Sequence, residues 1–253
     1  MVPPAPAPSA AVILVPSKEL TPLESWLVHS DAGDVPMRLV HDDIAAGRTL
    51  LTQPSLPVDV TDPAVEHLVA RMRATLTESQ GVGIAAPQVG VLRRVVLVQR
   101  LDLEAEPVEA YYNPAISFLS EDIEPGWEGC LSVPGGRGQV ERAHDIRVTH
   151  ESADGSVEEP IEGWTARIFQ HEVDHLEGVL FSDRMLSSRL LPTDEYKAMR
   201  AAQDAADQPP DGEPVSATPS ETGPHVDPPF TAETIRGATE AGRRYTFRIQ
   251  DGD

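Results

Sequence analysis

The stretch from Phe169 to Gly178 reads FQHEVDHLEG, and the spacing of its two histidines decides how the rest of the chain is interpreted. On a helix, His171 and His175 lie on one face, about one turn apart. Glu172 is next to the first histidine and can reach a water on an ion held between the two rings. This arrangement is typical of metal-dependent amide hydrolysis. A charged surface helix with two incidental histidines is the alternative.

The helix that carries this motif is expected to run from about Gly163 to Glu177 and to stop at Gly178, a favourable residue after a helix end. Ile168 lies one turn before His171 on the same face, where it can form the wall of a pocket. A second stripe of apolar residues would pack on a sheet: Phe169, Val173 and Leu176.

The segments upstream of this helix indicate an α+β fold. Asp62 is a suitable N-cap for a helix that begins at Pro63 and has an apolar stripe at helical spacing. The stripe consists of Val65, Leu68, Val69, Met72 and Leu76. Alternating residues predict strands over residues 93–100, 109–113, 145–151 and 157–161. One helix, several strands and a late helix do not form alternating βαβ units, so we expect an α+β domain.

The chain divides into three parts by composition. Residues 1–37 are expected to be an N-terminal extension of unknown order, and residues 38–192 a single catalytic domain. Residues 193–253 are expected to begin as a helix and continue as an acidic, proline-rich, disordered tail, because this tail has almost nothing to bury.

Charge and cysteine content exclude several classes of protein. The 253 residues carry a formal net charge of −21, which opposes nonspecific binding to nucleic acids or anionic membranes. No apolar run approaches the roughly 18 residues of a membrane span, and the N-terminus has no convincing targeting signal. Cys130 is the only cysteine, so an intrachain disulfide is impossible. We therefore expect a cytoplasmic protein that binds neither nucleic acid directly nor membranes.

Two histidines leave a metal ion short of protein ligands, and the acids after the helix lie too close to its end to complete the site. Upstream, the segment Glu128–Gly135, EGCLSVPG, contains Cys130. A lone cysteine is usually a small buried apolar residue, but beside this helix it becomes the candidate third ligand. A thiolate and two imidazoles suit a borderline-soft divalent ion and leave a fourth position for water.

The segment Gly81–Gly90, GVGIAAPQVG, offers a further candidate. Its two close glycines resemble part of a dinucleotide-binding fingerprint, but the third glycine is missing and a helix precedes them, which excludes that class. A helix stop followed by a tight turn is one interpretation. The other is a flat backbone wall with Gln88 directed into a cleft, where its amide can stabilise a developing oxyanion.

These three segments, in this order, resemble the peptide deformylase family. The matching motifs are GVGIAAPQ at residues 81–88, EGCLS at 128–132 and HEVDH at 171–175, and the resemblance covers about residues 55–190. The stretch HDDIAAGRTLLTQPSLPV departs from the usual start of the family's domain, which leaves the N-terminal strand open. The resemblance implies an α+β fold in which mostly antiparallel strands pack around a central C-terminal helix with the HExxH motif.

The resemblance also implies a function: removal of the formyl group from the N-terminal formyl-methionine of newly made polypeptides, with release of formate. The implied partners are formyl-methionyl nascent peptides and the ribosome near its exit tunnel. One divalent ion would be bound, with Fe(II) favoured over nickel, cobalt or zinc. The implied site residues are Cys130, His171 and His175 as metal ligands, Glu172 as acid and base, and Gln88 with the backbone N–H of Leu131 as oxyanion donors.

The peptide portion of the substrate would lie as an added strand between Val82–Ile84, with Gly83 at its centre, and Gly129. The methionine side chain would enter an apolar pocket formed by Val82, Trp164 and Ile168. Arg137 could sit at the mouth of this pocket. For Trp164, simple core packing is an equal alternative, and for Arg137 a solvated surface position is favoured.

Two rival functions are open. A metallopeptidase that cuts internal peptide bonds would need a ligand downstream of His175. A non-catalytic relative that binds formylated N-termini or the ribosome would be expected to have lost Glu172 or Gln88, and both are present.

Overall fold

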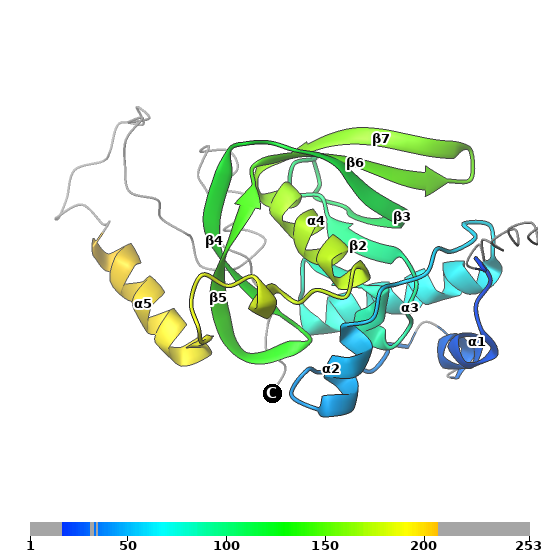
Figure 1. The fold of residues 1–253 in the computed structure, drawn as a ribbon, viewed down its shortest axis with the longest axis horizontal. Helices are drawn as coiled ribbons and strands as arrows, with labels where there is room; N and C mark the ends of the chain where they lie inside the picture. Colours follow the sequence, from blue (N-terminus) through cyan, green and yellow to red (C-terminus); the bar gives the residue numbers. More distant parts are fainter. Residues whose placement is uncertain (1–16, 31–32, 34, 207–253) are drawn as a thin grey trace, which may run out of the picture.

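The computed structural model describes residues 17–30, 33 and 35–206, and it contains two antiparallel sheets (Figure 1). The five-stranded sheet has the order β1-β2-β3-β6-β7, and the three-stranded sheet has the order β4-β5-β8. The strands are β1 Gly83–Ala85, β2 Val95–Gln99, β3 Val108–Leu119, β4 Ile123–Cys130, β5 Val133–Ala143, β6 Asp145–Ser152, β7 Gly155–Glu162 and β8 Leu191–Pro192. Every pair of neighbouring strands is antiparallel, as expected.

Helix α4, Gly163–Leu176, lies centrally and contacts strands of both sheets (Figure 1). Every residue from Trp164 to Leu176 is buried. A helix that is buried on all sides belongs to the core, so its apolar stripe packs as predicted. The Phe169 ring, for example, meets the edge of Tyr111 on β3 with a centroid distance of 4.5 Å. The helix also brings polar side chains into the core, and these need partners there.

Helix α3, Pro63–Ser79, begins as the sequence predicts. The carboxylate of Asp62 accepts a hydrogen bond from the backbone N–H of Ala64 at 2.9 Å, and all five residues of the predicted stripe are buried. The C-cap of this helix is Gln80, which adopts a left-handed conformation, rather than the glycine that follows.

The four predicted strands are present, and two long strands were missed. Strands β4 and β5 form a hairpin around the EGCLS segment, where no alternating pattern predicted a strand. Their sequences, IEPGWEGC and VPGGRGQVERA, contain glycine, proline and charged residues, all of which are depleted in strands. Pairing between the two strands, rather than intrinsic preference, therefore determines this hairpin.

Residues ahead of the predicted first helix also have regular structure. Helix α1 spans Pro22–His29 and helix α2 spans Ala45–Leu51. Helix α1 packs against α3 at one end of the molecule, and helix α5, Thr193–Ala206, lies at the opposite end beside β5 (Figure 1). The predicted acidic tail after residue 206 lies outside the described residues.

Two buried arginines hold α1 in place. Arg93 donates hydrogen bonds to both carboxylate oxygens of Glu24, at 3.0 and 2.8 Å. Arg71 donates to the carbonyl oxygens of Leu27 and Val28, at 2.8 and 2.9 Å, near the end of α1. Buried polar groups need such partners, so the N-terminal segment is attached through hydrogen bonds as well as apolar packing.

None of the helices in the described ranges combines the length and apolar character that a helix needs to span a lipid bilayer.

Candidate metal centre

The predicted ligands meet at the contact between β4 and α4. Cys130 is the last residue of β4, and His171 and His175 project from α4. One ligand atom from each residue lies within 4.8 Å of the others. The Cys130 Sγ is 3.2 Å from Nε2 of His175, and the two imidazole centroids are 5.1 Å apart. The cysteine therefore lies beside the paired histidines, and all three residues are buried.

The surroundings of Cys130 suit a bound cation. Burial raises the pKa of the thiol, and the N–H of Ser132, which donates to Sγ at 3.4 Å, opposes this only in part. The amide of Gln88 also donates to Sγ at 3.4 Å. A buried sulfur without a positive neighbour stays protonated, whereas a divalent ion stabilises the thiolate. A thiolate with two imidazoles is a donor set that fits a borderline divalent ion.

Glu128 fixes the orientation of His171. Its carboxylate oxygen Oε2 lies 2.9 Å from Nδ1 of His171 and also accepts from Arg142, while Oε1 accepts from Arg142 and Arg167. Burial alone would raise the pKa of Glu128, but the charge of Arg142 and hydrogen bonds from Arg142 and His171 hold it well below its usual value. An ionised carboxylate only accepts, so Nδ1 of His171 donates and Nε2 is the candidate ligand atom.

The second histidine is held in the form that binds metals. Burial, followed by the nearby His171, lowers the pKa of His175 well below its ordinary value. The imidazole is therefore neutral at pH 7, which is the protonation state of a metal ligand.

Glu172 is fully buried, and neither carboxylate oxygen has a hydrogen-bond partner among the described residues. Burial, reinforced by the charge of Glu128, raises the pKa of Glu172 well above its usual value. A buried carboxyl group with a raised pKa and no hydrogen-bond partner among the described residues is a candidate for a group that exchanges protons.

A glycine makes room for this carboxyl group. A Cβ atom added to Gly83 on β1 would lie 2.6 Å from Oε1 of Glu172 and 2.8 Å from Cγ2 of Ile168. Real side chains essentially never approach that closely. The flat backbone wall that the sequence suggested thus lies directly against Glu172.

Gln88 is in the short 3-10 helix η1, Ala86–Val89, which turns the chain from β1 toward β2. Its Oε1 accepts the N–H of Ala85 at 2.8 Å, which orients the amide so that Nε2 points at Cys130. The segment therefore forms the tight turn of one interpretation and directs Gln88 inward as in the other. Leu131 directly follows Cys130 in the turn between β4 and β5 and is buried.

The predicted substrate-binding residues lie on or next to elements that neighbour the cluster, and one alternative for them is corrected. Val82 and Ile84 are buried on either side of Gly83, and Trp164 lies one helical turn before Ile168 on α4. A solvated surface position for Arg137 is wrong. Only 3% of Arg137 is exposed, and its side chain covers Gly129, where an added Cβ would lie 3.4 Å from the Arg137 Cγ.

Sequence reasoning missed the ion-pair network behind the histidines. Arg142 joins Glu128 to Asp174, whose Oδ2 lies 2.6 Å from Nη1, and Arg184 binds the same aspartate. Glu128 and Asp174 both occur within the recognised motifs, so they could have been noticed. Arg142 had no such signal, because its partners are 14 and 32 residues away.

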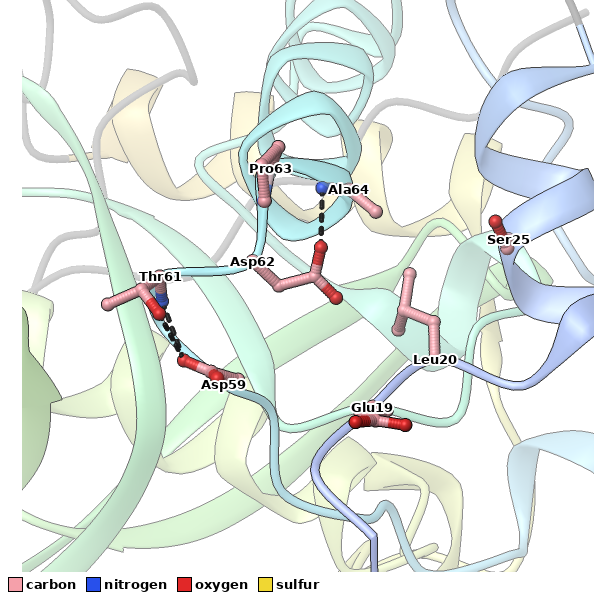
Figure 2. A pocket seen from close by; sticks show the side chains of 8 residues that line it. All are labelled: Glu19, Leu20, Ser25, Asp59, Thr61, Asp62, Pro63 and Ala64. Atoms are coloured by element: carbon pink, nitrogen blue, oxygen red, sulfur yellow. Dashed lines mark hydrogen bonds between the residues drawn. The ribbon is translucent and has the colours of Figure 1, made fainter.

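A surface pocket lies elsewhere, at the start of α3, and Figure 2 shows its lining. Its aspartates cap local backbone: Asp59 accepts from the N–H and hydroxyl of Thr61, and Asp62 accepts from Ala64. None of the clustered cysteine and histidine ligands lines this pocket, so we assign it no part in the chemistry.

Comparisons with known proteins agree with this geometry. The family model described as "Polypeptide deformylase" matches residues 42–190, which include every residue of the cluster. "Peptide deformylase" from Desulforudis audaxviator is 44% identical over 136 residues, covering 53% of this chain and 86% of that protein. "Peptide deformylase 1" from Prochlorococcus marinus is 42% identical over 138 residues, covering 51% and 72%.

Solved structures of similar proteins indicate the same family. The class I type b peptide deformylase from Acinetobacter baumannii with bound Met-Ala-Ser is 37% identical, with a TM-score of 0.55, and the match covers 60% of this chain and all of that chain. Peptide deformylase from Thermotoga maritima is 35% identical, with a TM-score of 0.54 and coverage of 60% and 99%. The chain belongs to the peptide deformylase family of metallohydrolases, which remove the formyl group from the N-terminus of newly made polypeptides.

Proposed function

We propose that Cys130, His171 and His175 hold one divalent ion and that the chain uses it to release formate from formyl-methionyl nascent peptides. The observation that carries this proposal is the buried cysteine–histidine cluster beside the buried carboxyl group of Glu172, which has no partner among the described residues. We propose Fe(II) as the native ion, because the resemblance implies iron and the donor set suits it. Nickel, cobalt or zinc would fit the same ligands.

An ion held by Cys130, His171 and His175 would supply Lewis-acid chemistry, which can lower the pKa of water from about 15.7 toward about 7. Glu172 is the proton carrier. It takes a proton as water attacks the formyl carbon and then delivers one to the departing amine nitrogen. Its raised pKa favours the second step, because the carboxyl group holds the proton it has taken until the amine nitrogen departs. A positioned group of this kind contributes about 10²–10⁴-fold to the rate.

Gln88 and the backbone N–H of Leu131 are the proposed oxyanion donors. The hydrogen bond between Gln88 and Ala85 holds the amide in place before substrate binds, so little reorganisation is needed. The loss of one such donor typically costs about 10²–10³-fold in turnover.

The peptide portion of the substrate is proposed to add as a strand along Val82, Gly83 and Ile84, facing Gly129 on the other side. Strand β1 is at the edge of its sheet, and among the described residues it pairs only with β2, which leaves one edge for a peptide. Val82, Trp164 and Ile168 would receive the methionine side chain. Arg137 would border this pocket.

Nascent peptides made on cytoplasmic ribosomes are the proposed substrates, with the ribosome near its exit tunnel as a partner. The net charge of −21 argues against direct contact with nucleic acid or anionic lipid. Residues 38–192 are proposed as the catalytic domain, between an N-terminal extension over residues 1–37 and a C-terminal extension over residues 193–253. The hydrogen bonds to Arg71 and Arg93 attach part of the first extension to that domain.

The test is formate release from formyl-Met-Ala-Ser by the full chain, purified without oxygen and loaded with iron, with metal content measured in the same sample. Unformylated Met-Ala-Ser is the control. Release of formate without cleavage of internal peptide bonds supports the proposal. Cleavage of the control would favour a metallopeptidase, and binding without release under any divalent ion would favour a non-catalytic relative.

A further inference from the structure

The chain after α4 returns to enclose Arg137 on β5. Strand β8 pairs with β5 at this point, with Leu191 opposite Arg137. The residues that flank Arg137 are Gly136 and Gly138, and a Cβ at either position would collide, with the backbone of Leu191 or the side chain of Met185 respectively. The absence of these side chains lets the C-terminal segment lie directly on β5.

Helix α5 completes the enclosure with an aromatic ring. The guanidinium carbon of Arg137 is 5.1 Å from the ring centroid of Tyr196, and both residues are buried. Trp127 on β4 meets the same ring at 5.4 Å with an interplanar angle of 60°. A cation over an aromatic face is worth more when it is shielded from water, as it is here.

The enclosed arginine lies against the backbone that is proposed to bind the substrate. The Cγ, Cζ and Nε atoms of Arg137 would be 3.4, 3.5 and 3.6 Å from a Cβ at Gly129, which is van der Waals contact. Side chains alternate along a strand, so Glu128 and Cys130 face α4, while Trp127 and Gly129 face α5. Helices α4 and α5 thus lie on opposite faces of β4, an arrangement that Figure 1 also shows.

We propose that Tyr196 is a positioning residue for substrate binding: through Arg137 it holds the backbone of Gly129 where the peptide portion of the substrate docks. The inference rests on the proposed function, because Gly129 is a proposed substrate contact. It assigns a role in recognition to α5, which lies beyond the family match at residues 42–190. The ligands and Glu172 are on the other face of β4, so Tyr196 affects peptide affinity rather than the chemical step.

The experiment compares full-length wild type with Tyr196→Leu, which keeps apolar bulk but removes the ring face. With formyl-Met-Ala-Ser we expect KM to rise about fivefold to thirtyfold, the equivalent of about 1–2 kcal/mol at about 1.4 kcal/mol per factor of ten. Metal content and kcat should stay within about twofold of wild type. With formyl-methionine, which lacks the peptide portion, kcat/KM should change by less than about twofold.

Two matched variants control for damage to the helix. Tyr196→Phe keeps the ring and should therefore have the same KM as wild type. Lys197→Ala removes an exposed neighbour on α5 and should behave as wild type. If Tyr196→Leu melts below the assay temperature, Tyr196→Met tests the same stack, because its flexible side chain fills the space and also lacks the ring face.

The possible outcomes distinguish a failure of the proposed function from a failure of the role assigned to Tyr196. No formate release by wild type contradicts the proposed function and the inference that rests on it. Release by wild type, with an unchanged KM in the folded variant, contradicts the inference alone. An equal loss with both substrates, or loss of metal, would mean that the stack supports only the fold, which also overturns the positioning role.

Discussion

Glu128 accepts a hydrogen bond from His171 at 2.9 Å, and it does so from the strand that ends at Cys130. One strand therefore supplies a proposed ligand and also the group that orients another ligand. Arg142 and Arg167 bind the same carboxylate, which keeps it ionised although it is fully buried. The proposed metal centre thus depends on the charged side chains of Glu128, Arg142 and Arg167 directly behind it.

The first prediction tests those charged side chains. Glu128→Gln keeps the shape of the side chain but removes its charge, so His171 loses a strong acceptor and two arginines lose their counter-ion. We expect metal affinity to fall about 10- to 100-fold. We also expect a loss of stability of about 3–5 kcal/mol, because breaking a buried ion pair leaves uncompensated charge. Chelator competition and thermal melting measure the two effects, with the exposed Glu141→Gln as the control. Normal affinity would show that Glu128 does not orient His171.

The second prediction concerns the proton carrier. Glu172→Ala removes a carboxyl group that binds no described residue, so metal content should be unchanged. Turnover should fall by about 10²–10⁴-fold. Formate release and metal analysis on the same preparation test this. Full activity in Glu172→Ala would remove Glu172 from the mechanism.

The third prediction uses the close approach at Gly83. In Gly83→Ala the new methyl group would meet the carboxylate at 2.6 Å and displace it, so we expect turnover to drop about tenfold to a hundredfold with metal retained. The same change in a Glu172→Ala background should cost less, because the carboxylate is gone and only the close contact with Ile168 remains. Equal losses in both backgrounds would mean that Gly83 acts without Glu172.

The fourth prediction concerns pH and the attachment of α1. Burial raises the pKa of Glu24, but hydrogen bonds from Arg93 and Thr21 and the charge of Arg93 lower it to a net value below the ordinary 4.5. A depressed folded pKa gives stability that is complete above pH 4.5 and is lost as pH falls through the folded value. Glu24→Gln should lose about 1–2 kcal/mol at pH 7, and the difference from wild type should shrink below pH 4.5. Melting curves from pH 7 to pH 3 test this, and a constant difference would contradict it.

The fifth prediction separates α5 from the residues that follow it. A chain that ends at residue 206 keeps Tyr196 and its stack, so formate release and KM should match the full chain. A chain that ends at residue 192 lacks the ring and should show the raised peptide KM of Tyr196→Leu. Loss of turnover in a folded chain ending at residue 206 would mean that the later residues contribute to the site.

Local patterns predicted the parts of this protein that depend on short spacings. The helix with His171 and His175, the capped start of α3 and its buried stripe all follow from residues within a few turns of each other. The contact between Cys130 and the two histidines could not be predicted from local spacing. It required the observation that two histidines leave a metal ion without a third protein ligand, together with the resemblance of three motifs.

The remaining features depend on partners that are distant in the sequence. Strands β4 and β5 have poor strand composition and form because they pair with each other. The burial of Arg137 depends on Tyr196, 59 positions later, and that of Arg93 depends on Glu24, 69 positions earlier. Buried polar pairs have no sequence periodicity, so no local pattern predicts them.

The attachment of α1 has a consequence for the order in which the molecule can be assembled. The chain is made from its N-terminus, so Glu24 is synthesised 69 residues before Arg93. At roughly 5–20 residues per second, the wait between the two is about 3–14 s. During that time α1 can be bound by Arg71 on α3, which is made earlier, but it still lacks its ion pair with Arg93. The attachment of α1 is therefore completed in two stages, and the charged contact comes second.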